Sequence, residues 1–164
     1  MRLSWPLTGR SEEMRSISAA MSAPDTSGIV IAGPMGVGKS RIAREAMSAA
    51  VSRGYEGRWV VGTSSARAIP LGAFTAWAPS GVTETVQLVR GVIESLTAGP
   101  TGAPVVLAVD DAHLLDDLSI FVVQQSLQRG AAKVILTVND GDAITPAVQE
   151  IWKVGRFDRL DLGT

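Results

Sequence analysis

Residues 28–40, GIVIAGPMGVGKS, decide the fold of this 164-residue chain. They begin with a continuous apolar run, GIVIAG, which is typical of a buried strand, and continue with the glycine-rich stretch PMGVGKS. Residues 41–54 follow, with small and apolar side chains recurring at helical spacing and a glycine at the end. The order predicts a strand, a tight glycine-rich loop and a helix.

The loop carries a phosphate-binding pattern. Residues 33–40 satisfy G-x-x-x-x-G-K-[ST], and the strand before and the helix after them supply the context that this motif requires. Glycines let backbone N–H groups turn toward phosphate oxygens, and the helix adds its positive N-terminal end. We expect Lys39 to reach the β- and γ-phosphates and Ser40 to bind Mg²⁺. The nucleotide-binding residues expected here are Gly33, Pro34, Met35, Gly36, Val37, Gly38, Lys39, Ser40 and Arg41.

Similar strands and helices alternate along the rest of the chain. Apolar runs predict further strands at 58–65, 103–111 and 133–140, and an alternating pattern predicts a terminal or edge strand at 157–162. Helical spacing of apolar residues predicts helices at 11–23, 82–98, 118–130 and 147–155, whereas residues 66–81 read as a loop. Strands that are apolar throughout indicate a parallel sheet covered on both faces. The expected fold is therefore an α/β P-loop NTPase, a three-layer α/β/α sandwich with a mostly parallel sheet of about five strands.

Two further strands end in polar residues. Asp110 and Asp111 close an apolar strand, and Thr137 to Asp140 close another. Because the carboxyl ends of parallel strands meet at one edge of the sheet, these clusters and the glycine-rich loop should converge on one crevice. Asp110 is expected to hold Mg²⁺ through water, and Asp111 to orient or deprotonate an attacking water. An aspartate is one methylene shorter than the glutamate that many relatives use, so we expect slow hydrolysis.

Three nearby residues are expected to have structural roles. His113, just after the aspartates, is expected to be structural rather than catalytic. Asp116 and Asp117 are expected to cap the helix that begins near Leu118.

Composition narrows the class of protein. Fifteen basic and sixteen acidic residues give a net charge of -1, so no broad positive field for DNA is expected in this chain. Zero cysteines and one histidine exclude a disulfide scaffold, a thiolate nucleophile and the usual zinc sites. The sequence contains no apolar stretch long enough for a membrane span, and Glu12 and Glu13 lie where a signal peptide would be apolar. We therefore expect a cytoplasmic protein that contacts no membrane.

The motifs together resemble a known family. WPLTGR (5–10), GPMGVGKS (33–40), VDDAHLLDD (109–117) and VILTVNDGD (134–142), with the later IWKVGRFDRLDL, are similar to the ATPase segment of large actinobacterial LuxR-type transcriptional regulators. That segment belongs to the signal-transduction ATPases with numerous domains (STAND), which are close to AAA+ and NB-ARC proteins. The resemblance implies ATP or ADP with Mg²⁺ as ligands and places Gly9 and Arg10 beside the adenine.

The resemblance also assigns a phosphate sensor. NB-ARC relatives have Thr-x-Arg at the end of the corresponding strand, whereas this chain has Thr137-Val138-Asn139. Asn139 can hydrogen-bond a phosphate or a water but adds no charge to the transition state, which puts rapid turnover in doubt. The catalytic set expected here is Lys39, Asp111 and Asn139, and the metal set is Ser40 and Asp110.

Domain organisation and function follow as expectations. Residues 1–24 are an N-terminal arm with a leading helix, and residues 25–164 are the P-loop core; the family's lid and DNA-binding domains are expected outside this chain, so that DNA is contacted only through them. The chain would be a Mg²⁺-dependent ATP-binding switch module with slow hydrolysis and, without the lid, an affinity in the micromolar range or weaker, about -8 kcal/mol. A small stand-alone phosphotransferase or kinase is one alternative, although residues 66–81 offer only Arg67 as a lid cation. A non-hydrolysing nucleotide-binding interaction module, with nucleotide-dependent self-association, is another.

Overall fold

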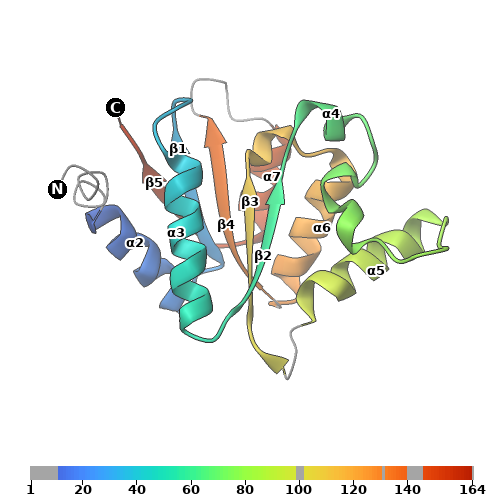
Figure 1. Ribbon diagram of the computed structural model, residues 1–164, viewed down its shortest axis with the longest axis horizontal. Coiled ribbons are helices and arrows are strands. Elements are labelled where there is room, and N and C mark those ends of the chain that lie inside the picture. The colour runs from blue at the N-terminus through green and yellow to red at the C-terminus, as the bar shows by residue number, and fades with distance from the viewer. Residues whose placement is uncertain (1–10, 99–101, 131, 140–145, 164) are drawn as a thin grey trace.

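The computed structural model describes residues 11–98, 102–130, 132–139 and 146–163 (Figure 1). The strands are β1 (Gly28–Gly33), β2 (Glu56–Val61), β3 (Val105–Asp110), β4 (Ala132–Asn139) and β5 (Phe157–Asp161). The helices are α2 (Ser11–Ser22), α3 (Lys39–Ser52), α4 (Ser64–Arg67), α5 (Thr85–Thr97), α6 (Asp117–Gln128) and α7 (Pro146–Val154), with 3-10 segments η2 (Gly72–Trp77) and η4 (Ala112–Leu114). Within these described residues, no helix combines the length and the apolar character needed to cross a bilayer.

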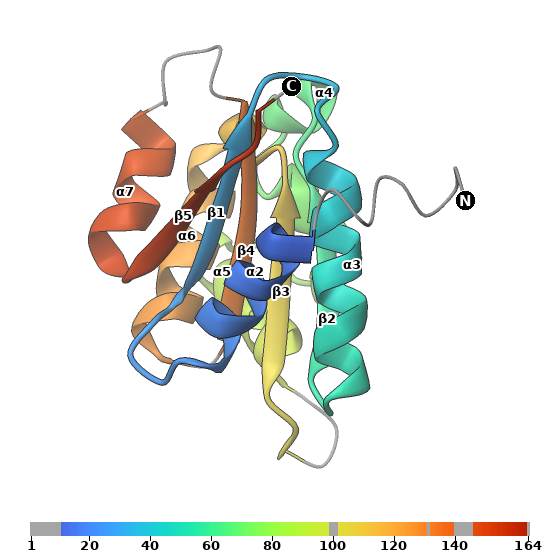
Figure 2. The ribbon, with the colours of Figure 1, turned by 90° about the vertical axis from the view of Figure 1, so that its left-hand side faces the viewer.

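The five strands form one sheet between two layers of helices. Every strand pairing is parallel, and the order is β2-β3-β4-β1-β5. Figure 2 shows α2 and α3 on one face of the sheet and α5, α6 and α7 on the other. This confirms the three-layer α/β/α sandwich, with a sheet that is parallel throughout.

The continuous apolar sequence of β1 reflects burial on both sides. All six residues of β1 are buried. Ile29 and Ile31 pack with α2 and α3, whereas Val30 and Ala32 pack in the core under α5, α6 and α7. Successive strand residues point to opposite faces, so a strand covered on both faces must be apolar at every position.

The strand order determines which side chains meet. β4 lies between β1 and β3, and its last residue, Asn139, pairs in register with Gly33. β5 lies at the edge, which confirms the edge-strand prediction, and its alternating sequence matches a strand that is only partly covered. The strand that carries Thr137 and Asn139 is therefore inserted between the phosphate-loop strand and the aspartate strand.

The segment between β2 and α5 differs from its predicted form. β2 ends at Val61 rather than at residue 65, because Thr63 caps α4: its hydroxyl oxygen accepts from the Ala66 amide (3.0 Å), and the helix begins at Ser64. α4 covers the last two residues of the predicted strand 58–65 and the start of the expected loop, and η2 lies within that loop and buries Phe74 completely. These elements are too short to show a periodic pattern, so no helical signal for them is visible in the sequence.

Candidate functional site

The loop between β1 and α3 has the geometry of a phosphate cradle. Gly36 and Gly38 have φ values of 81° and 103°, in the left-handed region where a side chain would be strained. Gly38 is the N-cap of α3, and the first turn of α3 contains no acidic residue. The N-terminal amides of α3 are therefore not capped by a side chain and face the loop as hydrogen-bond donors for an anion.

Lys39 lies folded against the loop that precedes it. Its side chain is 6% exposed, and its Nζ donates to the carbonyl oxygens of Gly33 and Pro34, both at 2.8 Å. An ammonium has three donors, so one remains for an acceptor in the pocket. The buried position keeps the positive charge at the mouth of the loop, where a phosphate would be stabilised.

Ser40 and Asp110 meet across the sheet although they are 70 residues apart in the chain. The Ser40 hydroxyl donates to Oδ2 of Asp110 at 2.7 Å. The other carboxylate oxygen, Oδ1, accepts a 2.5 Å hydrogen bond from the Thr137 hydroxyl of β4. Asp110 is 7% exposed, and both of its oxygens are thus held by neutral hydroxyl donors.

Asp111 turns out of the strand. Its backbone is left-handed, with φ 55° and ψ 53°, and its amide donates to the Thr137 hydroxyl at 2.8 Å. Burial raises the pKa of the Asp111 carboxyl above its ordinary value, and the neighbouring Asp110 raises it further, while His113 and Lys39 oppose the shift. Asp111 thus combines a left-handed backbone with a raised carboxyl pKa. Both features are enriched at functional sites.

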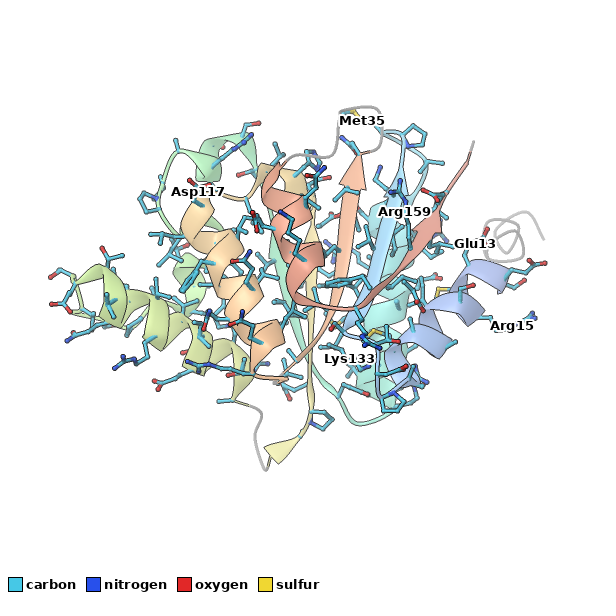
Figure 3. All side chains as sticks on the ribbon, turned by 180° about the vertical axis from the view of Figure 1, so that it is seen from behind. Glu13, Arg15, Met35, Asp117, Lys133 and Arg159 are labelled. Carbon is cyan, nitrogen blue, oxygen red and sulfur yellow. The ribbon has the colours of Figure 1, made fainter. Side chains whose placement is uncertain are left out.

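Lys39, Ser40 and Asp111 line one open pocket of about 710 Å³, a size common for small-molecule sites. Its walls come from the phosphate loop, the start of α3, the start of α4, η4 and the end of β4; the lining residues are Met35, Gly36, Gly38, Lys39, Ser40, Arg41, Ser64, Asp111, His113, Leu114 and Asn139. Met35, which is 84% exposed, is seen in Figure 3 beyond the arrowhead of β4, at the carboxyl edge of the sheet. The three polar clusters thus converge on one crevice.

Not every residue expected in the site faces the pocket. Val37 packs its side chain against the core between the sheet and α2 and α3, so only its backbone belongs to the loop. Gly33 and Pro34 contribute the carbonyls that hold Lys39. Gly9 and Arg10 lie outside the described residues.

Three polar residues at the site are absent from the catalytic, nucleotide-binding and metal sets expected from the sequence. Ser64 lines the pocket from the start of α4, just after β2, and the polar run Thr63 to Ser65 at the end of an apolar strand was the available signal. Thr137 was expected only as part of the polar strand end 137–140, with no role of its own. His113, expected to be structural, lines the pocket, and its Nδ1 is buried without a hydrogen-bond partner among the described residues.

The donor set fits magnesium only in part. Ser40 and Asp110 offer hydroxyl and carboxylate oxygens, the ligand type that Mg²⁺ prefers. The described residues contain no group of three or more acidic or histidine side chains that could hold a metal by themselves. A Mg²⁺ ion at this position would therefore need phosphate oxygens and waters to complete its octahedron, as is usual in nucleotide sites.

Another hollow, of about 590 Å³, lies away from this edge. It is lined by residues that precede β1 and by the start of β5, including Asp25, Arg156 and Asp158. Parallel sheets bind ligands outside the carboxyl ends of their strands, whereas this hollow lies near the start of β1 and β5. We therefore do not take it as the candidate site.

Solved structures share the fold. The Aeropyrum pernix Orc1 protein in complex with DNA matches with a TM-score of 0.65 at 14% identity, over 93% of this chain and 44% of that chain. AMPPCP-bound DnaA from Aquifex aeolicus matches with a TM-score of 0.59 at 16% identity, over 93% of this chain and 46% of that chain. The S. cerevisiae Hsp104–ADP complex matches with a TM-score of 0.61 at 19% identity, over 94% of this chain and 26% of that chain. The chain thus spans less than half of each of these proteins.

The sequence comparison identifies the family. No curated protein matches the chain significantly. The family profile described as "AAA ATPase domain" matches residues 6–138, which include the phosphate loop, both aspartates and Thr137. Membership implies a nucleotide-binding site. On this match, which covers most of its length, the chain belongs to the AAA ATPase domain family.

Proposed function

We propose that this chain is a Mg²⁺-dependent ATP-binding module with slow hydrolysis, which serves as the nucleotide switch of a larger LuxR-type transcriptional regulator. The observation that carries the proposal is the convergence of Lys39, Ser40, Asp111 and Asn139 on one pocket, with Asp110 hydrogen-bonded to Ser40 behind it. These residues come from three strand ends, and the hollow lined by Asp25, Arg156 and Asp158 brings no such set together.

Each residue has a proposed role. Lys39 and the N-terminal amides of α3 bind the phosphates, and Ser40 with Asp110 holds Mg²⁺, which when bound would neutralise phosphate charge. Asp111 orients the attacking water, and Asn139 contacts the terminal phosphate. Gly9 and Arg10 are proposed beside the adenine on the resemblance alone, as is the division into an arm at 1–24 and a core at 25–164.

Slow hydrolysis is proposed from two features of the site. Asp111 is shorter than a glutamate, and Asn139 brings no positive charge to a transition state that spreads negative charge over the phosphoryl oxygens. We expect turnover well below the median enzyme value of about 10 s⁻¹. Steady-state phosphate release from the wild type, with Lys39→Ala as the background, measures it. No turnover above that background would favour the non-hydrolysing interaction module instead.

Titration calorimetry tests the binding step. The chain is titrated with ATP, ADP and GTP, each with and without Mg²⁺, and compared with Lys39→Ala and with Lys153→Ala. Lys153 is an exposed lysine of α7 that pairs only loosely with Glu150 (3.7 Å), so its replacement controls for the loss of one positive charge. We expect Mg²⁺-enhanced binding of adenine nucleotides that Lys39→Ala loses and Lys153→Ala keeps. Equal binding by both variants, or none by the folded wild type, contradicts the proposal.

The regulatory context needs a separate measurement. Intact-mass analysis of the protein isolated from its native cells should find this sequence within a much longer polypeptide that ends in a helix-turn-helix domain. DNA contact would then come from that domain, in line with the balanced charge of the present chain. A polypeptide of 164 residues that transfers phosphate to an acceptor would support the phosphotransferase alternative.

A further inference from the structure

A buried hydroxyl of β4 connects the two aspartates of the site. Thr137 is 1% exposed and lies on the central strand between β1 and β3. Its neighbours in the strand, Leu136 and Val138, are apolar and buried. A hydroxyl in such surroundings is destabilising unless it is hydrogen-bonded, so its partners define what it does.

The two hydrogen bonds of Thr137 fix the direction of its proton. The Asp111 amide can only donate, and it lies 2.8 Å from the Thr137 oxygen. The hydroxyl proton is therefore free for Oδ1 of Asp110, which lies 2.5 Å away and can only accept when ionised. Thr137 accepts from one aspartate and donates to the other, and the arrangement cannot be reversed.

This arrangement orients the Asp110 carboxylate. The terminal torsion of an aspartate is soft, so the side chain alone does not determine which oxygen faces the pocket. Thr137 occupies Oδ1 from within the sheet, which leaves Oδ2 on the side of Ser40, the residue proposed to bind Mg²⁺.

The same hydroxyl holds the turn at Asp111. A left-handed backbone is uncommon at a non-glycine residue and persists only where the surrounding structure stabilises it. Here the Asp111 amide is tied back to β4, while the amide of Gly62 bonds the preceding carbonyl, that of Asp110. The chain therefore leaves the line of β3 at this point and brings Asp111 to the pocket wall.

We infer that Thr137 is a positioning residue that sets both aspartates through one hydroxyl, directing Oδ2 of Asp110 toward the magnesium position and Asp111 into the pocket. It touches neither nucleotide nor metal itself. The inference rests on the proposed function for its consequence in nucleotide binding, whereas the positioning of Asp111 is a property of the nucleotide-free chain.

Two matched substitutions separate the hydroxyl from the methyl group. Thr137→Val keeps the shape and removes the hydroxyl, and Thr137→Ser keeps the hydroxyl and removes the methyl group. In the nucleotide-free chain, hydrogen exchange of the Asp111 amide should become about tenfold faster in Thr137→Val and stay near the wild-type rate in Thr137→Ser. Unchanged exchange in Thr137→Val overturns the inference, whatever the nucleotide experiments give.

The second readout is the effect of Mg²⁺ on ATP affinity. The ratio of the Kd without Mg²⁺ to the Kd with Mg²⁺ should fall by about tenfold or more in Thr137→Val, as is typical when the partner of a metal ligand is removed. The Mg²⁺-free Kd and the Thr137→Ser ratio should match the wild type. An equal loss in both variants assigns the effect to packing and overturns the inference.

The outcomes distinguish this inference from the proposed function. A wild type without any Mg²⁺ effect contradicts the proposed function, and the Asp111 exchange then still decides the positioning claim. If Thr137→Val does not fold by circular dichroism, Thr137→Ala replaces it in both measurements, because it also lacks the hydroxyl.

Discussion

Asp111 combines two features that are unfavourable for folding and that place its carboxyl group in the site. Its backbone is left-handed, and its carboxyl is partly buried beside the Asp110 carboxyl, which raises its pKa. Both features are unfavourable to the folded chain, and both place a carboxyl at the pocket wall. Such local costs are common where a fold must present a reactive group.

Replacing Asp111 should therefore stabilise the chain at neutral pH. The folded state holds the Asp111 proton more tightly than the unfolded state, whose pKa is near 3.8, so stability falls as pH rises through the window from that value to the raised one. Asn cannot ionise and tolerates the left-handed backbone well. We expect urea denaturation to show Asp111→Asn above the wild type at about pH 7, with the difference shrinking toward about pH 4.

Asp158→Asn, which removes an exposed carboxylate of β5, controls for the change in net charge. A destabilised Asp111→Asn at neutral pH would show that the carboxylate stabilises the fold, contrary to this account.

At the scale of elements, the Asp116 side chain connects the start of α6 to the segment that contains α4 and η2. It is the N-cap of α6: its Oδ2 accepts from the Ser119 amide (3.2 Å) and its Oδ1 from the Ser119 hydroxyl (2.5 Å). This confirms the cap predicted at Asp116, whereas Asp117 lies in the first turn of α6 and makes no cap hydrogen bond within the part of the chain that the structure describes. The same Oδ2 accepts from the amide of Leu71, just before η2 (2.9 Å). The cap therefore also anchors the α4–η2 segment, one end of which reaches the pocket at Ser64.

Asp116→Ala should lower the free energy of unfolding by about 1–3 kcal/mol, because it removes the cap and leaves the Leu71 amide without its partner. Asp116→Asn should lose much less, since Asn is an equally good N-cap. Urea denaturation measures both. Equal losses would mean that the charge of Asp116, rather than its hydrogen-bonding geometry, stabilises these segments.

At the scale of the whole molecule, the two ends of the sheet have different roles. At the amino edge, the Lys133 ammonium donates to the carbonyls of Ala23 and Thr26 and ties β4 to the turn before β1; Figure 3 shows it at the opposite end from Met35. At the carboxyl edge, the strand ends meet in the open pocket. A ligand there would join β1, β3 and β4, and so would stabilise the sheet as a unit.

Binding should accordingly appear in the melting temperature. At a ligand concentration of about 100 Kd, mass action stabilises the folded state by about 2.7 kcal/mol, or about 5–10 °C in Tm for a chain of this size. We expect Mg²⁺-ATP to give this shift with the wild type and with Lys153→Ala, and to give none with Lys39→Ala. A shift that survives in Lys39→Ala would place the ligand elsewhere.

Local sequence patterns predict the strands, the main helices and the phosphate loop. Periodicity, turn residues and caps act over a few neighbouring positions, which is why the strands, the main helices, the edge position of β5 and the Asp116 cap were predicted. The phosphate-loop motif is equally local, because one tight turn and one helix start contain all of its residues. The roles of Lys39, Ser40, Asp110, Asp111 and Asn139 remain predictions that the geometry supports.

The order of the strands in the sheet, and with it the hydrogen bonds of Thr137, depends on the tertiary structure. The placement of β4 between β1 and β3 depends on packing across the whole sheet, and no stretch of sequence encodes it. The Thr137 hydroxyl bonds Asp110 and Asp111, which lie 27 and 26 residues away in the chain, and the backbone at Asp111 is left-handed. Local patterns report local free energies, whereas these features arise from contacts that exist only after the sheet has formed.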